Sequence, residues 1–140
     1  MYIIPEVRFM NWVAIAVGAL IGGFLRYMFE VVIPPLASLP LGTLAVNLLG
    51  CLLLGFIYSA ADQKEWPAWL RLGLGTGMIG AFTTFSTFSL EMTQLIQGHM
   101  MEAISYGLIS IIGGVFFVMI GEWLAGTWFE KSILTEELYS

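Results

Sequence analysis

Small hydroxyl residues alternate with phenylalanines in one stretch of the chain, residues 80–89 (GAFTTFSTFS). The hydroxyl groups are neutral hydrogen-bond donors, and each phenyl ring has a positive edge. Together these groups could replace the water shell of a small anion. Glycines at positions 73, 75, 77 and 80 crowd the preceding segment, and a glycine costs a helix interior about 1 kcal/mol relative to alanine. The stretch is therefore predicted to interrupt a helix.

An interrupted helix leaves backbone groups without partners, and in a membrane such groups are tolerated only against protein or water. Freed carbonyl groups favour a cation. The interruption, placed at residues 80–83, therefore predicts a site where a cation is fixed while an anion passes nearby. Phe85 and Phe88 are three residues apart and would lie close to one face of the resumed helix. The alternative for both rings is ordinary packing.

Two other apolar stretches carry polar residues at depth. Asn47 needs hydrogen-bond partners there, and Thr43 lies one turn earlier on the same face. Asn47 either joins two helices or offers its NH2 group as a donor to a polar pathway. Tyr106 and Ser110 form a second polar stripe, which Gly114 continues without a hydroxyl. The alternative for these hydroxyls is a bond to their own helix backbone.

Charged residues are few in the apolar stretches. Arg26 and Glu30 are four apart, so they share a helix face, and a mutual ion pair is the simplest interpretation. Glu91 follows the interruption and is expected near the membrane surface. Because no titratable group clearly lies at mid-depth, a proton-coupled pump is disfavoured. Cys51 is the only cysteine, which excludes an intrachain disulfide and a multi-cysteine metal site.

Composition indicates the elements that position these residues. The 140 residues are 59% hydrophobic and 11% charged, whereas about a quarter of a soluble domain is charged. The chain is therefore predicted to be an all-α membrane protein with a single integral domain, residues 1–140. Spans of about 20 residues are expected at 11–33, 41–60, 69–97 and 103–125, with the third interrupted. The formal charge of −5 excludes a basic nucleic-acid surface, and no feature indicates an enzyme.

Assembly and orientation follow from small and basic residues. Gly18 and Gly22 are four apart and allow another helix to approach closely. Four spans make thin walls for a pore, so at least a dimer is expected. Four of the five basic residues fall on one side of the predicted membrane, which favours both termini inside: Arg8, Lys64, Arg71 and Lys131. So few charges do not exclude insertion in both orientations.

These features resemble the bacterial Fluc/CrcB family of fluoride channels over nearly the whole chain. The matching segments are residues 22–27 (GGFLRY), 42–47 (GTLAVN) and 80–89 (GAFTTFSTFS), the last followed by Glu91. The third segment is very specific to this family. The presence of all three segments in this order, in a chain of four predicted spans, makes the resemblance stronger still.

The resemblance implies a dual-topology, antiparallel dimer of four-helix subunits, with two fluoride pores along the subunit interface. It implies a role in the fluoride pore for Asn47, Phe85, Phe88, Tyr106 and Ser110, and Thr43 is added from its place beside Asn47. It also implies that the backbone carbonyls of Gly80 and Thr83 hold a structural sodium ion, which is not transported. Arg26 and Glu91 match positions near the pore ends.

We therefore expect a passive fluoride-selective channel in the bacterial inner membrane, through which the membrane potential drives fluoride out of the cell and reduces its toxicity. The expected partners are fluoride, sodium, membrane lipid and a second chain. Both a homodimer and a heterodimer with a paralogous chain remain open. Gly114 stands where a longer polar stripe would carry another hydroxyl, so how far the stripe extends beyond Ser110 is left open. The alternative function is a small dual-topology multidrug exporter, for which Glu30 is the only candidate acid, late in its span beside Arg26.

Overall fold

The computed structural model describes residues 5–34, 36 and 38–139. Within these ranges the chain is helical and contains no β-strand; Leu36 and Leu39 form one isolated antiparallel bridge in the loop after the first helix. The helices in chain order are α1 (Pro5–Val32), α2 (Leu41–Gln63), α3 (Ala68–Arg71), the π-helix η1 (Leu72–Ile79), α4 (Gly80–Phe82), α5 (Phe85–Gly98) and α6 (Met100–Tyr139).

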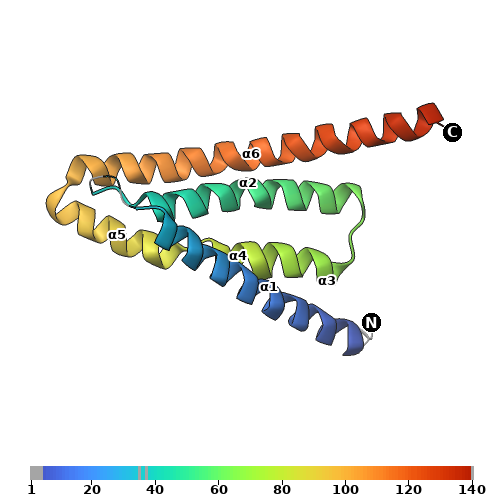
Figure 1. Cartoon of the computed structure of the whole chain (residues 1–140), viewed down its shortest axis with the longest axis horizontal. Helices are drawn as coiled ribbons and strands as arrows, with labels where there is room; N and C mark the ends of the chain where they lie inside the picture. Colours follow the sequence, from blue (N-terminus) through green and yellow to red (C-terminus); the bar gives the residue numbers. More distant parts are fainter. Residues whose placement is uncertain (1–4, 35, 37, 140) are drawn as a thin grey trace.

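The long helices form an elongated bundle (Figure 1). α2 lies along α6, α1 crosses the consecutive helices α3, η1 and α4, and α5 packs on α6. Both ends of the chain and the α2–α3 connection lie at one end of the bundle. The α1–α2 loop and the α5–α6 turn lie at the other end.

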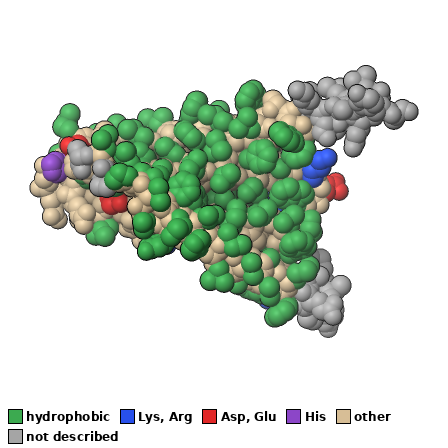
Figure 2. Space-filling view, in the orientation of Figure 1, with side chains coloured by type: hydrophobic (Ala, Val, Ile, Leu, Met, Phe, Trp, Pro, Cys, Tyr) green, Lys and Arg blue, Asp and Glu red, His purple; other side chains and the backbone are tan. Residues whose placement is uncertain are grey.

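Apolar side chains cover much of the surface seen in Figure 2, and the charged side chains visible there lie near the two ends. In the part of the chain that the structure describes, three helical segments are long and apolar enough to cross a membrane: Arg8–Val32, Leu41–Gln63 and Met100–Phe129. They overlap the first, second and fourth predicted spans. The predicted span 69–97 is divided among α3, η1, α4 and α5.

Glycines let α1 lie directly against η1. A Cβ atom at Gly18 would overlap the carbonyl oxygen of Gly73, and one at Gly22 would overlap that of Met78. The missing side chains therefore allow backbone-to-backbone contact between the two helices. This is the close helix contact that the four-residue spacing of Gly18 and Gly22 predicts.

The backbone changes direction between α4 and α5. Thr83 (φ −78°, ψ 157°) and Thr84 (φ −144°, ψ 126°) are extended, whereas Gly80 is still helical (φ −61°, ψ −32°). The irregular backbone thus lies at Thr83, the last residue of the interruption predicted at 80–83, and at Thr84, the residue after it. The widened π-helical turns of η1, rich in glycine, precede it. Residues 83 and 84 therefore present backbone groups that a continuous helix would hide.

Candidate functional site

The side chain of Asn47 pairs with the extended backbone at Thr84. Its Nδ2 donates to the Thr84 carbonyl oxygen (3.0 Å), and the Thr84 amide nitrogen donates to Asn47 Oδ1 (2.8 Å). Because the backbone fixes which group donates and which accepts, the orientation of the side-chain amide is determined by these two bonds. Asn47 therefore joins α2 to the start of α5, and one of its two amide hydrogens has no partner among the residues that the structure describes.

This pairing releases the carbonyl group of Gly80. In a continuous α-helix the Gly80 carbonyl would accept from the amide of Thr84, four residues later, but that amide donates to Asn47. The Thr83 carbonyl loses its helical partner in the same way, because the amide of Thr87 donates to Thr84 Oγ1 (3.2 Å). The irregular turn thus leaves backbone oxygens without helical partners, and those of Gly80 and Thr83 are among them.

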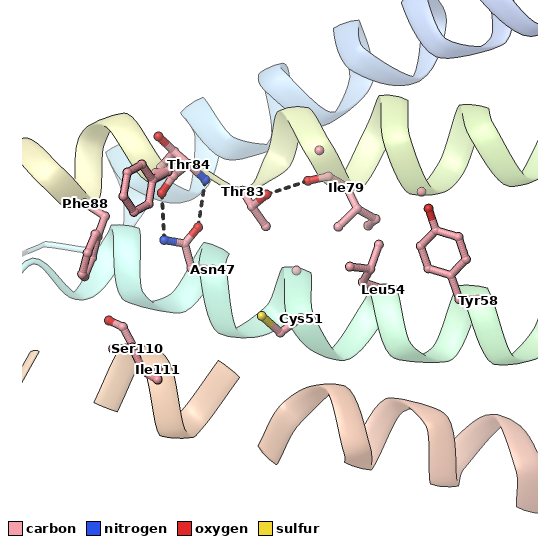
Figure 3. A pocket seen from close by; sticks show the side chains of 14 residues that line it. Asn47, Cys51, Leu54, Tyr58, Ile79, Thr83, Thr84, Phe88, Ser110 and Ile111 are labelled. Carbon is pink, nitrogen blue, oxygen red and sulfur yellow. Dashed lines mark hydrogen bonds between the residues drawn. The ribbon is translucent and has the colours of Figure 1, made fainter. Parts of the chain in front are cut away.

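A pocket of about 550 Å³ runs along α2 between the irregular turn and α6 (Figure 3). Both polar and apolar residues line it, and none of them carries a charged side chain. The lining residues are Asn47, Gly50, Cys51, Leu54, Tyr58, Gly75, Ile79, Gly80, Thr83, Thr84, Phe85, Phe88, Ser110 and Ile111. The free amide hydrogen of Asn47, the released carbonyls and two phenyl rings therefore belong to one pocket.

The two phenylalanines of the pocket lie at the beginning of α5. The Phe85 and Phe88 ring centroids are 6.0 Å apart, and those of Phe88 and Tyr106 are 5.1 Å apart. Phe85 is 80% exposed, whereas Tyr106 is only 1% exposed. Phe88 thus packs between another ring of the pocket and the α6 tyrosine, while Phe85 projects from this chain without being covered by it.

A carboxylate connects the polar residues of α2 and α6. Glu91 Oε1 accepts from Thr43 Oγ1 (2.7 Å), and Glu91 Oε2 accepts from the Tyr106 hydroxyl (2.8 Å). Thr43 and Tyr106 are buried. Hydrogen bonds to a carboxylate are shorter and stronger than those between neutral groups, so Glu91 fixes both hydroxyls. The sequence singled out all three residues but did not predict that they meet.

Two further residues of the predicted site make local contacts. Ser110 lines the pocket, but its hydroxyl donates to the backbone carbonyl of Tyr106 (2.7 Å), which is the alternative expected for a hydroxyl in a membrane helix. Gly114 is the next position of the polar stripe, four residues after Ser110. A Cβ atom on Gly114 would lie 3.4 Å from Cys51 Sγ. The thiol of α2 therefore lies beside the position where the α6 stripe lacks a hydroxyl.

Arg26 lies between α1 and the irregular turn. Its Nε is 4.0 Å from Glu30 Oε1, at the limit for an ion pair, and its Nη1 is 3.5 Å from the Thr83 carbonyl oxygen. Both contacts are long, so neither holds the guanidinium group tightly. The predicted ion pair with Glu30 is present at this distance.

Comparison with known proteins places this arrangement in a family. The family model described as CrcB-like protein, Camphor Resistance (CrcB), matches residues 13–122. The chain belongs to the CrcB-like family. Curated relatives include the "Fluoride-specific ion channel FluC 2" of Listeria innocua, 42% identical over 80% of this chain and 88% of the relative. The "Fluoride-specific ion channel FluC" of Methanocaldococcus jannaschii is 40% identical over 79% of this chain and 90% of the relative.

The matched region of this CrcB-like chain contains every residue assigned above to the site, and residues 123–140 fall outside it. Thr84 is the residue of the site whose role the sequence did not reveal. Besides pairing with Asn47, it caps α5 by accepting from the Thr87 amide. A threonine directly before an apolar helix is a typical N-cap, and this was the available signal.

Proposed function

We propose that the chain is a fluoride-selective channel and not an enzyme. The observation that carries the proposal is the pocket in which a free amide hydrogen of Asn47 lies with the phenyl rings of Phe85 and Phe88 and without a charged side chain. Neutral donors and ring edges stabilise an anion without binding it as tightly as a fixed cation would. The relatives bear the name of a fluoride-specific ion channel, which identifies the anion.

We propose that four crossings place this pocket inside the membrane. Three crossings are the apolar spans in α1, α2 and α6. The fourth combines α3, η1 and α4 with α5, joined at Thr83 and Thr84. The Asn47 pairing supports this assignment, because it satisfies backbone groups that the bilayer interior would leave without partners. The chain would then be a multi-pass protein of the bacterial inner membrane, in contact with lipid along its apolar surface.

We propose that two chains in antiparallel orientation complete the pore. Phe85 is 80% exposed although it lines the pocket, and a second copy would cover such a ring. A dimer with each chain oppositely inserted would place the open side of one pocket against the other. The relatives include chains named FluC 1 and FluC 2, so a paralogous chain is an alternative to a second copy.

We propose that the released carbonyls of Gly80 and Thr83 hold a structural sodium ion. Both residues line the pocket, and neither carbonyl has its helical partner because the amides of Thr84 and Thr87 donate elsewhere. Unwound backbone carbonyls are typical ligands of sodium in membrane proteins. The ion would supply a fixed positive charge beside the path of the anion, and two antiparallel chains would double the number of oxygens.

Anion efflux from liposomes that contain the purified protein tests the channel assignment. Fluoride and chloride electrodes are read side by side, with valinomycin and potassium to set the membrane potential. We expect fast fluoride release without chloride release. Equal release of both anions would contradict selectivity, and silence for both from monodisperse protein would contradict a channel formed by this chain alone.

A further inference from the structure

The large pocket extends well beyond the residues assigned to the pore. Figure 3 shows Phe88 at one end and Tyr58 at the other, with Asn47, Cys51 and Leu54 between them along α2. Tyr58 lies in the last turns of α2, near the α2–α3 connection, so this second end faces the same end of the bundle as both chain termini.

The hydroxyl of Tyr58 is held over the backbone of η1. A Cβ atom at Gly75 would lie only 2.9 Å from the Tyr58 hydroxyl oxygen and 3.0 Å from the ring carbon that bears it. The absence of a side chain at Gly75 thus makes the space that the phenol group occupies. Both residues line the pocket, so the donor is available to a species inside it.

A positive charge lies directly against the same ring. The guanidinium carbon of Arg71 is 5.0 Å from the centroid of the Tyr58 ring, within the range of a cation–π contact. Arg71 Nη1 also lies 2.8 Å from Asp62 Oδ1. The Asp62 side chain is 63% exposed and that of Arg71 is 43% exposed, so water screens the carboxylate more than the guanidinium group. Of this pair, the guanidinium group is the member whose contact with a pocket-lining ring the structure shows.

We propose that Tyr58 and Arg71 form an anion-collecting site at the outer end of the pocket, and this rests on the proposed channel function. The site would take a small monovalent anion. The guanidinium group attracts the anion to the entrance, because a charge beside a low-dielectric cleft raises the local concentration of counter-ions. The Tyr58 hydroxyl donates to the anion once it has entered, and such a bond is strengthened by the charge of its acceptor. The carboxylate of Asp62, 2.8 Å from Arg71 Nη1, weakens this attraction, while the contact with the Tyr58 ring holds the guanidinium group at the site.

The same loop provides a matched control. Lys64 also carries a positive charge two residues after Asp62, but its Nζ lies 5.3 Å from the centroid of the Phe129 ring on α6. Neither Lys64 nor Arg71 lines the pocket itself, and the two differ in that Arg71 contacts the pocket-lining ring of Tyr58. Lys64→Gln and Arg71→Gln therefore remove the same charge from the same end of the molecule, and only Arg71→Gln removes it from Tyr58.

Initial fluoride efflux from liposomes tests the site at low and at physiological ionic strength. At about 10 mM salt, where a charge acts over about 30 Å, we expect Arg71→Gln to slow efflux about threefold and Asp62→Asn to speed it by a similar factor. At about 150 mM salt, where screening shortens this range to about 8 Å, both effects shrink. Tyr58→Phe lowers efflux at both salt concentrations because a hydrogen bond is short-ranged. Lys64→Gln lowers it at low salt by clearly less than Arg71→Gln does, because its charge lies on the Phe129 ring and not on Tyr58.

Equal rates for Arg71→Gln and Lys64→Gln at low salt would overturn the inference while leaving the channel function intact. So would a loss in Arg71→Gln that does not depend on salt, which would indicate a structural role. Asp62→Asn keeps the guanidinium group and should raise the efflux rate at low salt. A fluoride efflux rate at or below that of the wild type would therefore overturn the inference, even if Arg71→Gln does not fold. Absence of fluoride efflux from the wild-type protein would overturn the proposed function and this inference with it.

Discussion

Asn47 and Thr84, 37 residues apart in the sequence, exchange two hydrogen bonds, one in each direction between side-chain amide and backbone. The pair resembles the hydrogen-bond exchange between neighbouring strands, although it forms between a helix and an irregular turn. Asn47 thereby satisfies the backbone of the turn and still has one amide hydrogen for the pocket. A single side chain thus serves both the fold and the site.

Asn47→Ala should therefore lower stability as well as fluoride flux. The substitution leaves the amide and carbonyl groups of Thr84 unpaired, and each such group costs about 1–3 kcal/mol when buried. Thermal unfolding in detergent and fluoride efflux measure the two effects. Asn11→Ala is the matched control, since Asn11 Oδ1 is buried without a hydrogen-bond partner in the part of the chain that the structure describes. Equal stability of the two variants would contradict the structural role of Asn47.

Phe85→Ile gives a cleaner test of the pore. The ring is 80% exposed, so its loss should leave the folding of the chain nearly unchanged. We expect fluoride efflux to fall about tenfold, which corresponds to about 1.4 kcal/mol of lost anion stabilisation. Phe116→Ile is the control, because Phe116 is another exposed ring, at 58%, and does not line the pocket. An unchanged fluoride rate in Phe85→Ile would remove this ring from the pore.

Thr43 and Tyr106 should be energetically coupled through Glu91. Each hydroxyl donates to a different oxygen of this carboxylate, and a hydrogen bond to a charged group contributes about 1.5–3 kcal/mol. Thr43→Val and Tyr106→Phe should each lower the unfolding temperature in detergent, and their effects should not add in the double variant. In a Glu91→Ala background the same two substitutions should cost much less. Full additivity in the presence of Glu91 would contradict a shared carboxylate.

Gly22 and Gly23 provide neighbouring positions with opposite expectations. A Cβ atom at Gly22 would overlap the Met78 carbonyl oxygen, whereas one at Gly23 has no atom within 4 Å. Gly22→Ala should therefore separate α1 from η1 and greatly reduce the yield of monodisperse protein on size-exclusion chromatography. Gly23→Ala should be neutral or stabilising by up to about 1 kcal/mol, the difference in helix propensity. Similar yields for the two variants would mean that α1 does not pack on η1 in this way.

The sequence was sufficient for the features that depend on local composition. Apolar length indicated three helical segments of the described chain that could cross a membrane, whereas the predicted span 69–97 is divided among shorter helices. The glycines before Thr83 indicated irregular backbone, because this follows from the preferences of neighbouring residues. It also indicated that Asn47 needed a partner. It could not show that this partner is the backbone of Thr84, since the choice depends on how α2 lies against the start of α5.

The charged contacts were less predictable for the same reason. Glu91 was expected only near the membrane surface, but Thr43 and Tyr106 reach it from two other helices. Arg71 contributed only to the count of basic residues on one side, whereas the structure places it on the ring of Tyr58. Polar residues at depth can be listed from a sequence, but their pairing requires the register between helices.

Sodium should stabilise the folded protein in a saturable way. If the released carbonyls of Gly80 and Thr83 bind the ion, stability rises with sodium concentration as RT ln(1 + [Na⁺]/Kd), about 2.7 kcal/mol at one hundred times Kd. Protein purified in N-methylglucamine salts should therefore unfold at a lower temperature than protein to which sodium is returned, and its fluoride efflux should fall in parallel. Potassium at the same ionic strength is the control, because screening is identical while the ion is larger. The same unfolding temperature in both salts over the whole concentration range would show that these oxygens hold no selective sodium ion, and the fixed positive charge beside the anion path would have to come from a side chain.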